Sequence, residues 1–341
     1  MKTLLNPIRR NYRWSISAKP ERLWLALNNV GRLAETIGLP PGQYTSRTAG
    51  KLDIDATAAG GLLSRLLMPQ WRETPVQWIE GRWLKISRVR SRGLIAGLTW
   101  TITLEPQGNG CLVRHEFMIE PRSMWAAFIL SLFRQHLDRT MNEVGRTMAL
   151  WAKGAIDHPM PRPRALPRQT RGTLSDRAML ADGSQYGRGQ VSRLVRWMSH
   201  AQHQDTVRIR PTTLANLWGT NQDEVTEVLL AAAAARILAK HWLLTCTICG
   251  SEISDCKTLK DLPERARCPA CSAKVEIDLA HNVEMIFTPA DDLRGFQVRR
   301  YAWESPNDHS AVEVRIKIEA RGRLTSKWRA SRSGFLARVI G

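Results

Sequence analysis

Alternation of hydrophobic and polar residues predicts antiparallel strands through much of the first 120 residues. Tyr12–Ser17, Trp78–Val89 and Leu94–Leu104 follow this two-residue period. At the end of the third segment, large hydrophobic side chains share one face and three threonines the other. Gln-Gly-Asn-Gly at 107–110 predicts a hairpin turn, and Cys111–Ile119 then alternates again. We therefore expect a meander of antiparallel strands.

A long amphipathic helix is expected directly after these strands, from Ser123 to Lys153. Its hydrophobic positions recur at steps of three and four and form one stripe: Leu130, Phe133, Leu137, Met141, Val144, Met148 and Trp151. A shorter helix is expected to open at Lys19, because Pro20 suits a first-turn position. Since the sheet and the stripe each offer one hydrophobic face, we expect an α+β fold whose antiparallel sheet wraps a long helix.

Residues 10–155 resemble the START-like, or helix-grip, superfamily. The resemblance rests on the Ser-Ala-Lys-Pro-Glu-Arg-Leu-Trp opening at 17–24, the Trp-Ile-Glu-Gly-Arg run at 78–82 and the terminal helix. It implies an apolar cavity between sheet and helix that takes a small apolar ligand. The expected lining is Trp83, Trp100, His115, Phe117, Leu137, Met141 and Met148. The alternative is that these side chains simply fill a core, because no nucleophile–base pair or carboxylate pair accompanies His115.

After this first domain, residues 156–187 are expected to form an extended linker, because prolines alternate with arginines and glycines follow. A helical, winged-helix-like segment is expected at 188–245, with helices at Gly189–Ala201, Arg210–Trp218 and Asp223–Lys240. The last helix opens with acidic residues and continues through alanines, so it offers few donors to DNA. We expect a structural or protein-docking helix pair, and DNA reading is the alternative.

Two Cys-x-x-Cys pairs, separated by eighteen residues, predict a structural zinc site. The four expected ligands are Cys246, Cys249, Cys268 and Cys271. Four thiolates bind Zn²⁺ tetrahedrally and leave no position open for substrate, so this zinc ribbon at 246–280 would stabilise the fold. Cys256 is expected to be a bystander, and His241 and His281 are the fallback ligands. A redox role for the pairs is the alternative.

A second, narrower resemblance covers the later part of the chain. It rests on three runs: Arg210-Pro to Trp218, the two cysteine pairs, and His281-Asn-Val-Glu-Met-Ile-Phe-x-Pro289. These resemble the region of unknown function that precedes the catalytic domain in bacterial class III adenylate cyclases, where a START-like domain also comes first. The resemblance implies a β-rich segment, expected at 281–327 before a tail at 328–341. No cyclase catalytic residue can be carried over, which leaves a shortened cyclase or a stand-alone regulator.

Charge is concentrated in the first domain. The formal net charge is +19, and residues 1–155 hold 22 basic and 11 acidic residues, a net +11. Such a surface attracts nucleic acid or anionic lipid, although a solvated surface is the simpler interpretation. We expect no signal peptide and no apolar run near the ~20 residues that span a bilayer. The cysteine usage is typical of a reducing cytoplasm.

These features favour a non-catalytic cytoplasmic sensor or adaptor, and the resemblance in domain order implies a role in cyclic-nucleotide-type signalling. The helix-grip domain would bind a small apolar ligand or a protein partner, and the zinc-stapled module would relay its state. Two other classes stay open: a helix-grip enzyme of the polyketide cyclase or hydrolase kind, and a nucleic-acid-binding transcriptional regulator. Polar residues converging in the cavity would favour the enzyme. A contiguous basic face on the helix pair would favour the regulator.

Overall fold

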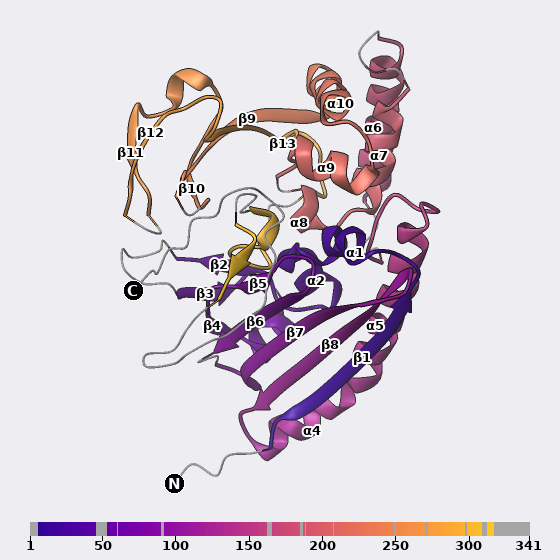
Figure 1. Ribbon diagram of the computed structural model, residues 1–341, viewed down its shortest axis with the longest axis vertical. Helices are drawn as coiled ribbons and strands as arrows, with labels where there is room; N and C mark the ends of the chain where they lie inside the picture. The colour runs from indigo at the N-terminus through magenta and orange to yellow at the C-terminus, as the bar shows by residue number, and fades with distance from the viewer. Residues whose placement is uncertain are drawn as a thin grey trace.

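The computed structural model describes residues 6–45, 53–59, 61–89, 92–161, 166–184, 187, 189–206, 208–248, 250–269, 272–296, 299–308 and 312–316. Its elements form two modules, each with its own hydrophobic core (Figure 1). The first module comprises residues 6–161, and the second comprises residues 166–296. A return segment, residues 299–316, leads from the second module back to the first.

The first module is built on an antiparallel sheet. Its strands are β1 (Ile8–Ile16), β2 (Gly42–Tyr44), β3 (Ile54–Ala58), β4 (Gln70–Glu73), β5 (Gln77–Ile79), β6 (Trp83–Val89), β7 (Ile95–Gln107) and β8 (Gly110–Pro121). The main path runs β1-β8-β7-β6-β4-β3-β2, and β5 pairs with β6. The β7–β8 hairpin closes where Gln107 faces Gly110, as predicted. The buried residues alternate along both strands, which confirms the predicted inner face.

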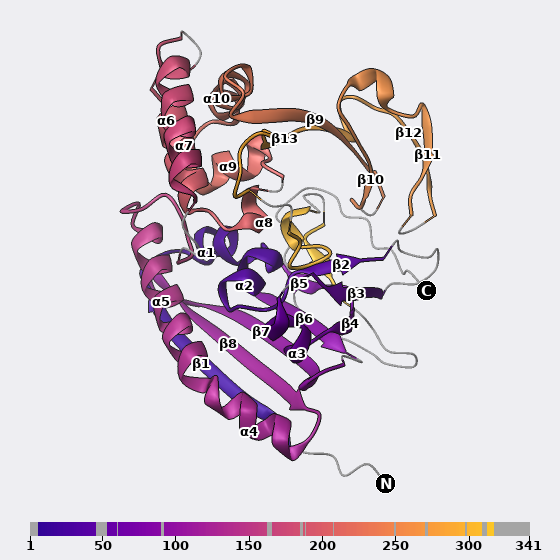
Figure 2. The ribbon, with the colours of Figure 1, turned by 180° about the vertical axis from the view of Figure 1, so that it is seen from behind.

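Five helices complete the first module: α1 (Pro20–Leu27), α2 (Val30–Thr36), α3 (Leu62–Leu67), α4 (Met124–Leu132) and α5 (Arg134–Ala152). The single long helix that was predicted is two helices in sequence, α4 and α5, which meet at Phe133. The stripe of α5 is buried against the concave face of the sheet (Figure 2). Gly145 permits this close packing, since a Cβ there would lie 2.7 Å from the indole nitrogen of Trp14. The predicted α+β sheet-on-helix arrangement is confirmed.

The second module joins a helical layer to a small sheet. Its helices are α6 (Arg168–Asp182), α7 (Val191–His200), α8 (His203–Thr206), α9 (Pro211–Trp218) and α10 (Gln222–Ala234). Its strands are β9 (Leu238–Thr245), β10 (Glu252–Cys256) and β13 (Val283–Pro289), in the order β10-β9-β13, with a separate hairpin of β11 (Arg265–Arg267) and β12 (Lys274–Glu276). Helices and sheet share one core through Leu229, Leu238 and Phe287.

Two predicted boundaries in this part of the chain are wrong. The expected linker at 156–187 contains α6, which buries Leu174 and Ala178 in the second core. Pro167 immediately precedes this helix, so the proline-rich run ends where the helix begins and does not prevent it. The helix expected at 223–240 ends at Ala234, because Arg236 adopts a φ of 57° and β9 follows at once.

The return segment ties the end of the described chain to the first sheet. Strand β14 (Val314–Arg315) pairs with β5, and the Trp78 indole donates a hydrogen bond of 3.1 Å to the carbonyl of Val312. The β-rich segment expected at 281–327 is therefore divided, with β13 in the second sheet and β14 in the first. The predicted tail at 328–341 lies outside the described residues.

Candidate functional site

The space between the sheet and α5 holds most of the side chains predicted to line a ligand cavity. Trp100, His115, Phe117, Met141 and Met148 are all buried there, and Leu137 packs against them half-buried. Trp83 is the exception, and its assignment to the lining is wrong. It alternates with the buried Leu84 on β6, so the pleat of the strand turns Trp83 to the outer face.

These interior side chains contact one another closely. The rings of Trp100 and Phe117 stack with centroids 4.6 Å apart, and Trp14 lies 4.6 Å from His115. None of the five buried side chains is more than 2% exposed, so this interior is closely packed. A ligand in this interior would have to displace them, and ligand binding at this place stays a prediction.

His115 is held as a neutral imidazole. The Trp100 indole, which can only donate, gives a hydrogen bond of 3.1 Å to His115 Nδ1, so the proton of the ring sits on Nε2. Burial lowers the pKa of His115 to about 3. Among the described residues, Nε2 has no hydrogen-bond partner. A neutral imidazole whose acceptor nitrogen is already engaged cannot act as a general base in this state.

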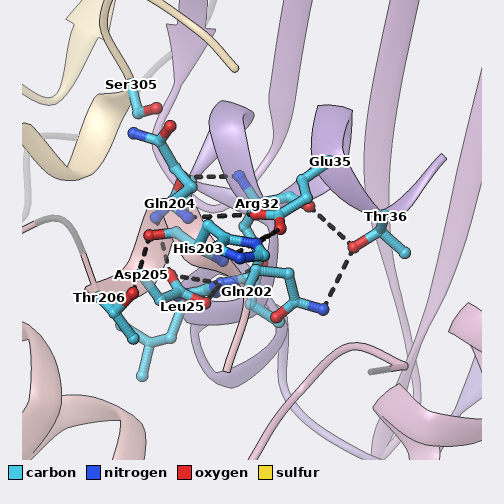
Figure 3. Close-up of polar contacts among 12 residues, drawn as sticks. Leu25, Arg32, Glu35, Thr36, Gln202, His203, Gln204, Asp205, Thr206 and Ser305 are labelled. Atoms are coloured by element: carbon cyan, nitrogen blue, oxygen red, sulfur yellow. Dashed lines mark hydrogen bonds and ion pairs between the residues drawn. The ribbon is translucent and has the colours of Figure 1, made fainter. Parts of the chain in front are cut away.

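A second concentration of polar residues lies at the junction between the modules, where α8 crosses α2 (Figure 3). Asp205 of α8 receives hydrogen bonds from Arg32 Nε at 2.8 Å and from Asn29 Nδ2 at 2.9 Å. Arg32 also donates from Nη1 to the carbonyls of Leu25 and Ala26, at the end of α1. The ion pair is almost completely buried, with side chains 1% and 6% exposed.

Glu35 on the same helix binds the start of α8. Its carboxylate contacts His203 Nδ1 at 2.5 Å and accepts hydrogen bonds from the backbone amides of His203 and Gln204, both at 3.1 Å (Figure 3). Gln204 packs directly on Gly31, where any Cβ would collide with it. A carboxylate that accepts amides at the beginning of α8 also satisfies groups that a helix leaves unpaired. These contacts hold the two modules in one defined arrangement.

Beside this network the two modules and the return segment enclose a cleft of about 380 Å³. Trp24 and Trp78 border it from the first module, although their side chains are only 4% and 1% exposed. Asn216, His281 and Glu284 contribute polar groups from the second. A cleft that lies between two modules and carries a few polar groups is a common place for a small-molecule site. Its residues come from segments nearly 300 positions apart, so only the assembled modules form it.

Arg210 lines this cleft together with two carboxylates, Glu80 and Glu284. It precedes α9 and is 7% exposed, with Nε 3.5 Å from a Glu284 oxygen and Nη1 3.3 Å from the carbonyl of Asn307. Its Nη2 is buried and has no hydrogen-bond partner in the described part of the chain. Burial raises the pKa of Glu284, and the Arg210 guanidinium opposes that rise. A buried guanidinium nitrogen without a partner is costly unless an acceptor reaches it.

The His281–Pro289 run, quoted above for its family resemblance, has a structural explanation. Asn282 is buried and closes the turn before β13, because its Oδ1 accepts the Asp278 amide and its Nδ2 donates to the Glu276 carbonyl, both at 2.8 Å. Two residues later, Glu284 reaches Arg210. The run therefore positions one wall of the cleft. His281 is exposed and pairs with Asp278 at 2.7 Å.

The predicted zinc ligands are described only in part, since Cys249 and Cys271 lie outside the described residues. Cys246 and Cys268 are buried in one small cluster with Val275. Both begin a similar turn. The Cys246 carbonyl accepts the Gly250 amide at 2.8 Å, and the Cys268 carbonyl accepts the Ser272 amide at 2.9 Å. The fallback ligand His241 instead lies 3.2 Å from Asp255.

Sequence reasoning missed the residues of the junction. Arg32, Glu35 and Asp205 belong to short polar helix segments whose hydrophobic pattern is unremarkable, and the buried state of their charges appears only after docking. The Arg210-Pro run is the one sequence feature that touches this site, and its pattern predicts only the start of a helix. Arg210 and Glu284, which form this pair, lie 74 positions apart in the sequence.

Comparisons with known proteins describe the two modules separately. Residues 178–318, less than half of the chain, match the model of a family of unknown function, DUF5939. No curated protein matches. Among solved structures, norcoclaurine synthase from Thalictrum flavum, in complex with dopamine and hydroxybenzaldehyde, is 12% identical with a TM-score of 0.30, covering 45% of this chain and 90% of that one.

Two bacterial structures are similar at the same level. CalU16 from Micromonospora echinospora is 16% identical with a TM-score of 0.24, covering 43% of this chain and 89% of that one. DR_A0006 from Deinococcus radiodurans is 11% identical with a TM-score of 0.28, covering 42% and 98%. Similarity this low carries no argument about ligand or activity. The helix-grip description of the first module rests on its own strand order and on the position of α5.

Proposed function

We propose that this chain is a non-catalytic sensor or adaptor whose ligand binds at the junction of the two modules. A molecule in the cleft would touch the helix-grip module, the second module and the return segment together. Binding there would stabilise the docked arrangement, because a ligand that binds only one state shifts the equilibrium toward it. The state of one module would thus be relayed to the other without any chemical step.

The observation that carries this proposal is that Nη2 of Arg210, a residue that lines the cleft, has no hydrogen-bond partner among the described residues. Guanidinium groups select carboxylate or phosphate acceptors. The ligand class that fits is therefore a small carboxylate or phosphate anion. This differs from the purely apolar ligand expected in the interior of the helix grip.

Native mass spectrometry of the purified protein tests this directly, since a bound small molecule adds its mass to the chain. Benzoate and inorganic phosphate would serve as probes in thermal-shift assays. We expect an anionic ligand to stabilise the wild-type protein. Arg210→Gln should bind that ligand at least about tenfold more weakly, because a hydrogen bond to a charged group contributes about 1.5–3 kcal/mol. Arg177→Gln, which removes an exposed pair with Asp292, is the matched control. Equal ligand responses in both variants would refute the proposal.

A structural zinc ion is proposed at the two cysteine turns, where Cys246 and Cys268 with Cys249 and Cys271 would hold it. In support, both described sulfurs belong to one buried cluster, and the Ile248 amide donates to Cys246 Sγ at 3.4 Å, as suits a thiolate acceptor. Bound zinc would supply cross-linking of the two turns and no catalysis. Elemental analysis of protein purified without chelators, expected to find one zinc per chain, tests it.

The signalling context is proposed on domain order alone. A helix-grip module followed by a DUF5939 match resembles the regulatory part of bacterial class III adenylate cyclases. In that context the sensor would act on a cyclase or a similar signalling partner through its second module. Affinity between the purified chain and a cyclase catalytic domain, measured with and without the cleft ligand, tests the link. The DNA-reading alternative is disfavoured because Asp223 and Glu224 at the start of α10 are exposed.

A further inference from the structure

Helix α4 presents an uncovered hydrophobic surface at the end of the first module farthest from the second (Figures 1 and 2). Its exposed side chains are Met124 (70% exposed), Trp125 (76%), Phe128 (58%), Leu132 (66%) and Phe133 (38%). Only Ala126 of this helix is buried. Single exposed hydrophobic residues are ordinary, but a contiguous group of this size marks an interaction site. We call these five residues the α4 surface.

Helix α3 extends the apolar end of the module. The carbonyl of Leu66 accepts the Leu94 amide at 3.1 Å, and the Leu94 carbonyl accepts the Arg122 amide at 2.9 Å. Arg122 lies two residues before α4, so both helices sit at the same end of the sheet (Figure 2). Leu62 and Leu66 of α3 are also exposed, at 86% and 49%. Two short apolar helices thus project from one end of the fold.

Basic residues outnumber acidic ones around this end. Residues 61–69, 92–94 and 121–137 contain no aspartate or glutamate. Glu120 and Asp138 border these segments, and Asp138 lies 3.6 Å from Arg134. Their charged residues are Arg65, Arg92, Arg122 and Arg134, all of them exposed. The first 155 residues share this bias, with 22 basic and 11 acidic residues. An apolar helix bordered by arginines complements a surface that is apolar inside and negative outside.

We propose that the α4 surface docks the first module onto an anionic lipid membrane. The exposed indole and phenyl rings would enter the boundary between headgroups and acyl chains, and the arginines would meet anionic headgroups. Docking of this kind places a helix on the membrane and not across it. In agreement, no helix among the described residues is both long and apolar enough to span a bilayer.

A second copy of the chain fits this surface less well. A twofold-symmetric dimer brings the same patch of each subunit face to face. The basic residues around α4, which outnumber Glu120 and Asp138, would then face their own copies, and this excess of like charge disfavours such contacts. An anionic bilayer instead attracts these arginines, and each arginine near the bilayer surface raises the binding affinity about fivefold.

Vesicle co-sedimentation of the full chain provides the test. Vesicles of phosphatidylcholine alone are compared with vesicles containing about 30% phosphatidylserine, at low and high salt. We expect binding to the anionic vesicles to be at least about tenfold stronger, and to weaken with salt. Trp125→Ser/Phe128→Ser should reduce it at least about tenfold, because both side chains lose apolar burial. Arg122→Gln/Arg134→Gln should reduce binding only to the anionic vesicles.

The control is Met179→Ser/Leu180→Ser, which removes two side chains that are 64% and 80% exposed on α6 of the second module. It should bind vesicles like the wild type, and circular dichroism should show every variant folded. The proposal is overturned if Trp125→Ser/Phe128→Ser leaves vesicle binding unchanged. It is also overturned if that variant instead converts a dimer to a monomer in light scattering, or removes a protein partner, while the wild type ignores anionic vesicles.

Discussion

The buried ion pair between Arg32 and Asp205 offers the sharpest test of how the two modules are held together. Asp205→Ala removes the carboxylate that accepts Arg32 Nε at 2.8 Å and Asn29 Nδ2 at 2.9 Å. Arg32 keeps its Nη1 bonds to Leu25 and Ala26, but its Nε loses its acceptor at a position 1% exposed. Removing one partner of a buried pair typically costs about 3–5 kcal/mol, because an uncompensated charge stays behind.

The chain contains a matched control in Arg72 and Asp55. This pair has the same nitrogen–oxygen separation, 2.8 Å, but its side chains are 32% and 61% exposed. Water replaces a lost partner there, so Asp55→Ala should cost no more than about 1 kcal/mol. The two substitutions therefore remove ion pairs with the same nitrogen–oxygen distance that differ in how deeply they are buried. Urea denaturation of both variants, with the unfolding slope checked for constancy, measures the difference.

The Arg32–Asp205 pair is nevertheless not expected to be a large net source of stability. Burial raises the pKa of Asp205, and the attraction of Arg32 only partly offsets that rise. Its value lies in defining how α8 docks on α2, so Asp205→Ala should also speed native-state proteolysis between the modules. If Asp205→Ala costs no more than Asp55→Ala and leaves proteolysis unchanged, the described junction does not hold the modules.

Three further expectations concern the metal, the buried histidine and catalysis. Cys268→Ser should abolish zinc binding and unfold residues ~245–275 locally. Amide hydrogen exchange in that segment should then be faster than in the wild type, and an unchanged exchange rate there would contradict this. Burial lowers the pKa of His115 to about 3, so as pH falls below 6.5 the unfolded chain takes up a proton that the folded chain does not. The free energy of unfolding should therefore fall by about 2 kcal/mol between pH 6.5 and 5. His115→Gln should flatten that slope in pH-dependent urea titrations, and an unchanged slope would assign it to other groups. Incubation with ATP or GTP and Mg²⁺ or Mn²⁺ should yield no cyclic product above background, since four thiolates select zinc and do not position a phosphate-bound metal.

Much of the first module could be predicted from the sequence, because its signals are local and periodic. The alternation in β7 and β8 and the stripe of α5 each specify one buried face, and a one-residue slip would expose every large side chain. The same reasoning failed for Trp83, where several hydrophobic residues adjoin and the phase of the strand is ambiguous. It failed for α6 because prolines and glycines surround a weak hydrophobic stripe.

What only the tertiary structure decided is the pairing of residues far apart in the chain. The burial of Arg32 against Asp205, of Arg210 beside Glu284, and the return of β14 to β5 leave no periodic pattern, since each depends on two surfaces meeting. The α4 surface is the converse case. Of its five residues only Phe133 belongs to the predicted stripe, and the sequence pattern did not show that the other four stay exposed, because periodicity cannot tell a covered face from an exposed one. Sequence determines which faces are hydrophobic, and the extent of the neighbouring elements determines which of those faces are buried.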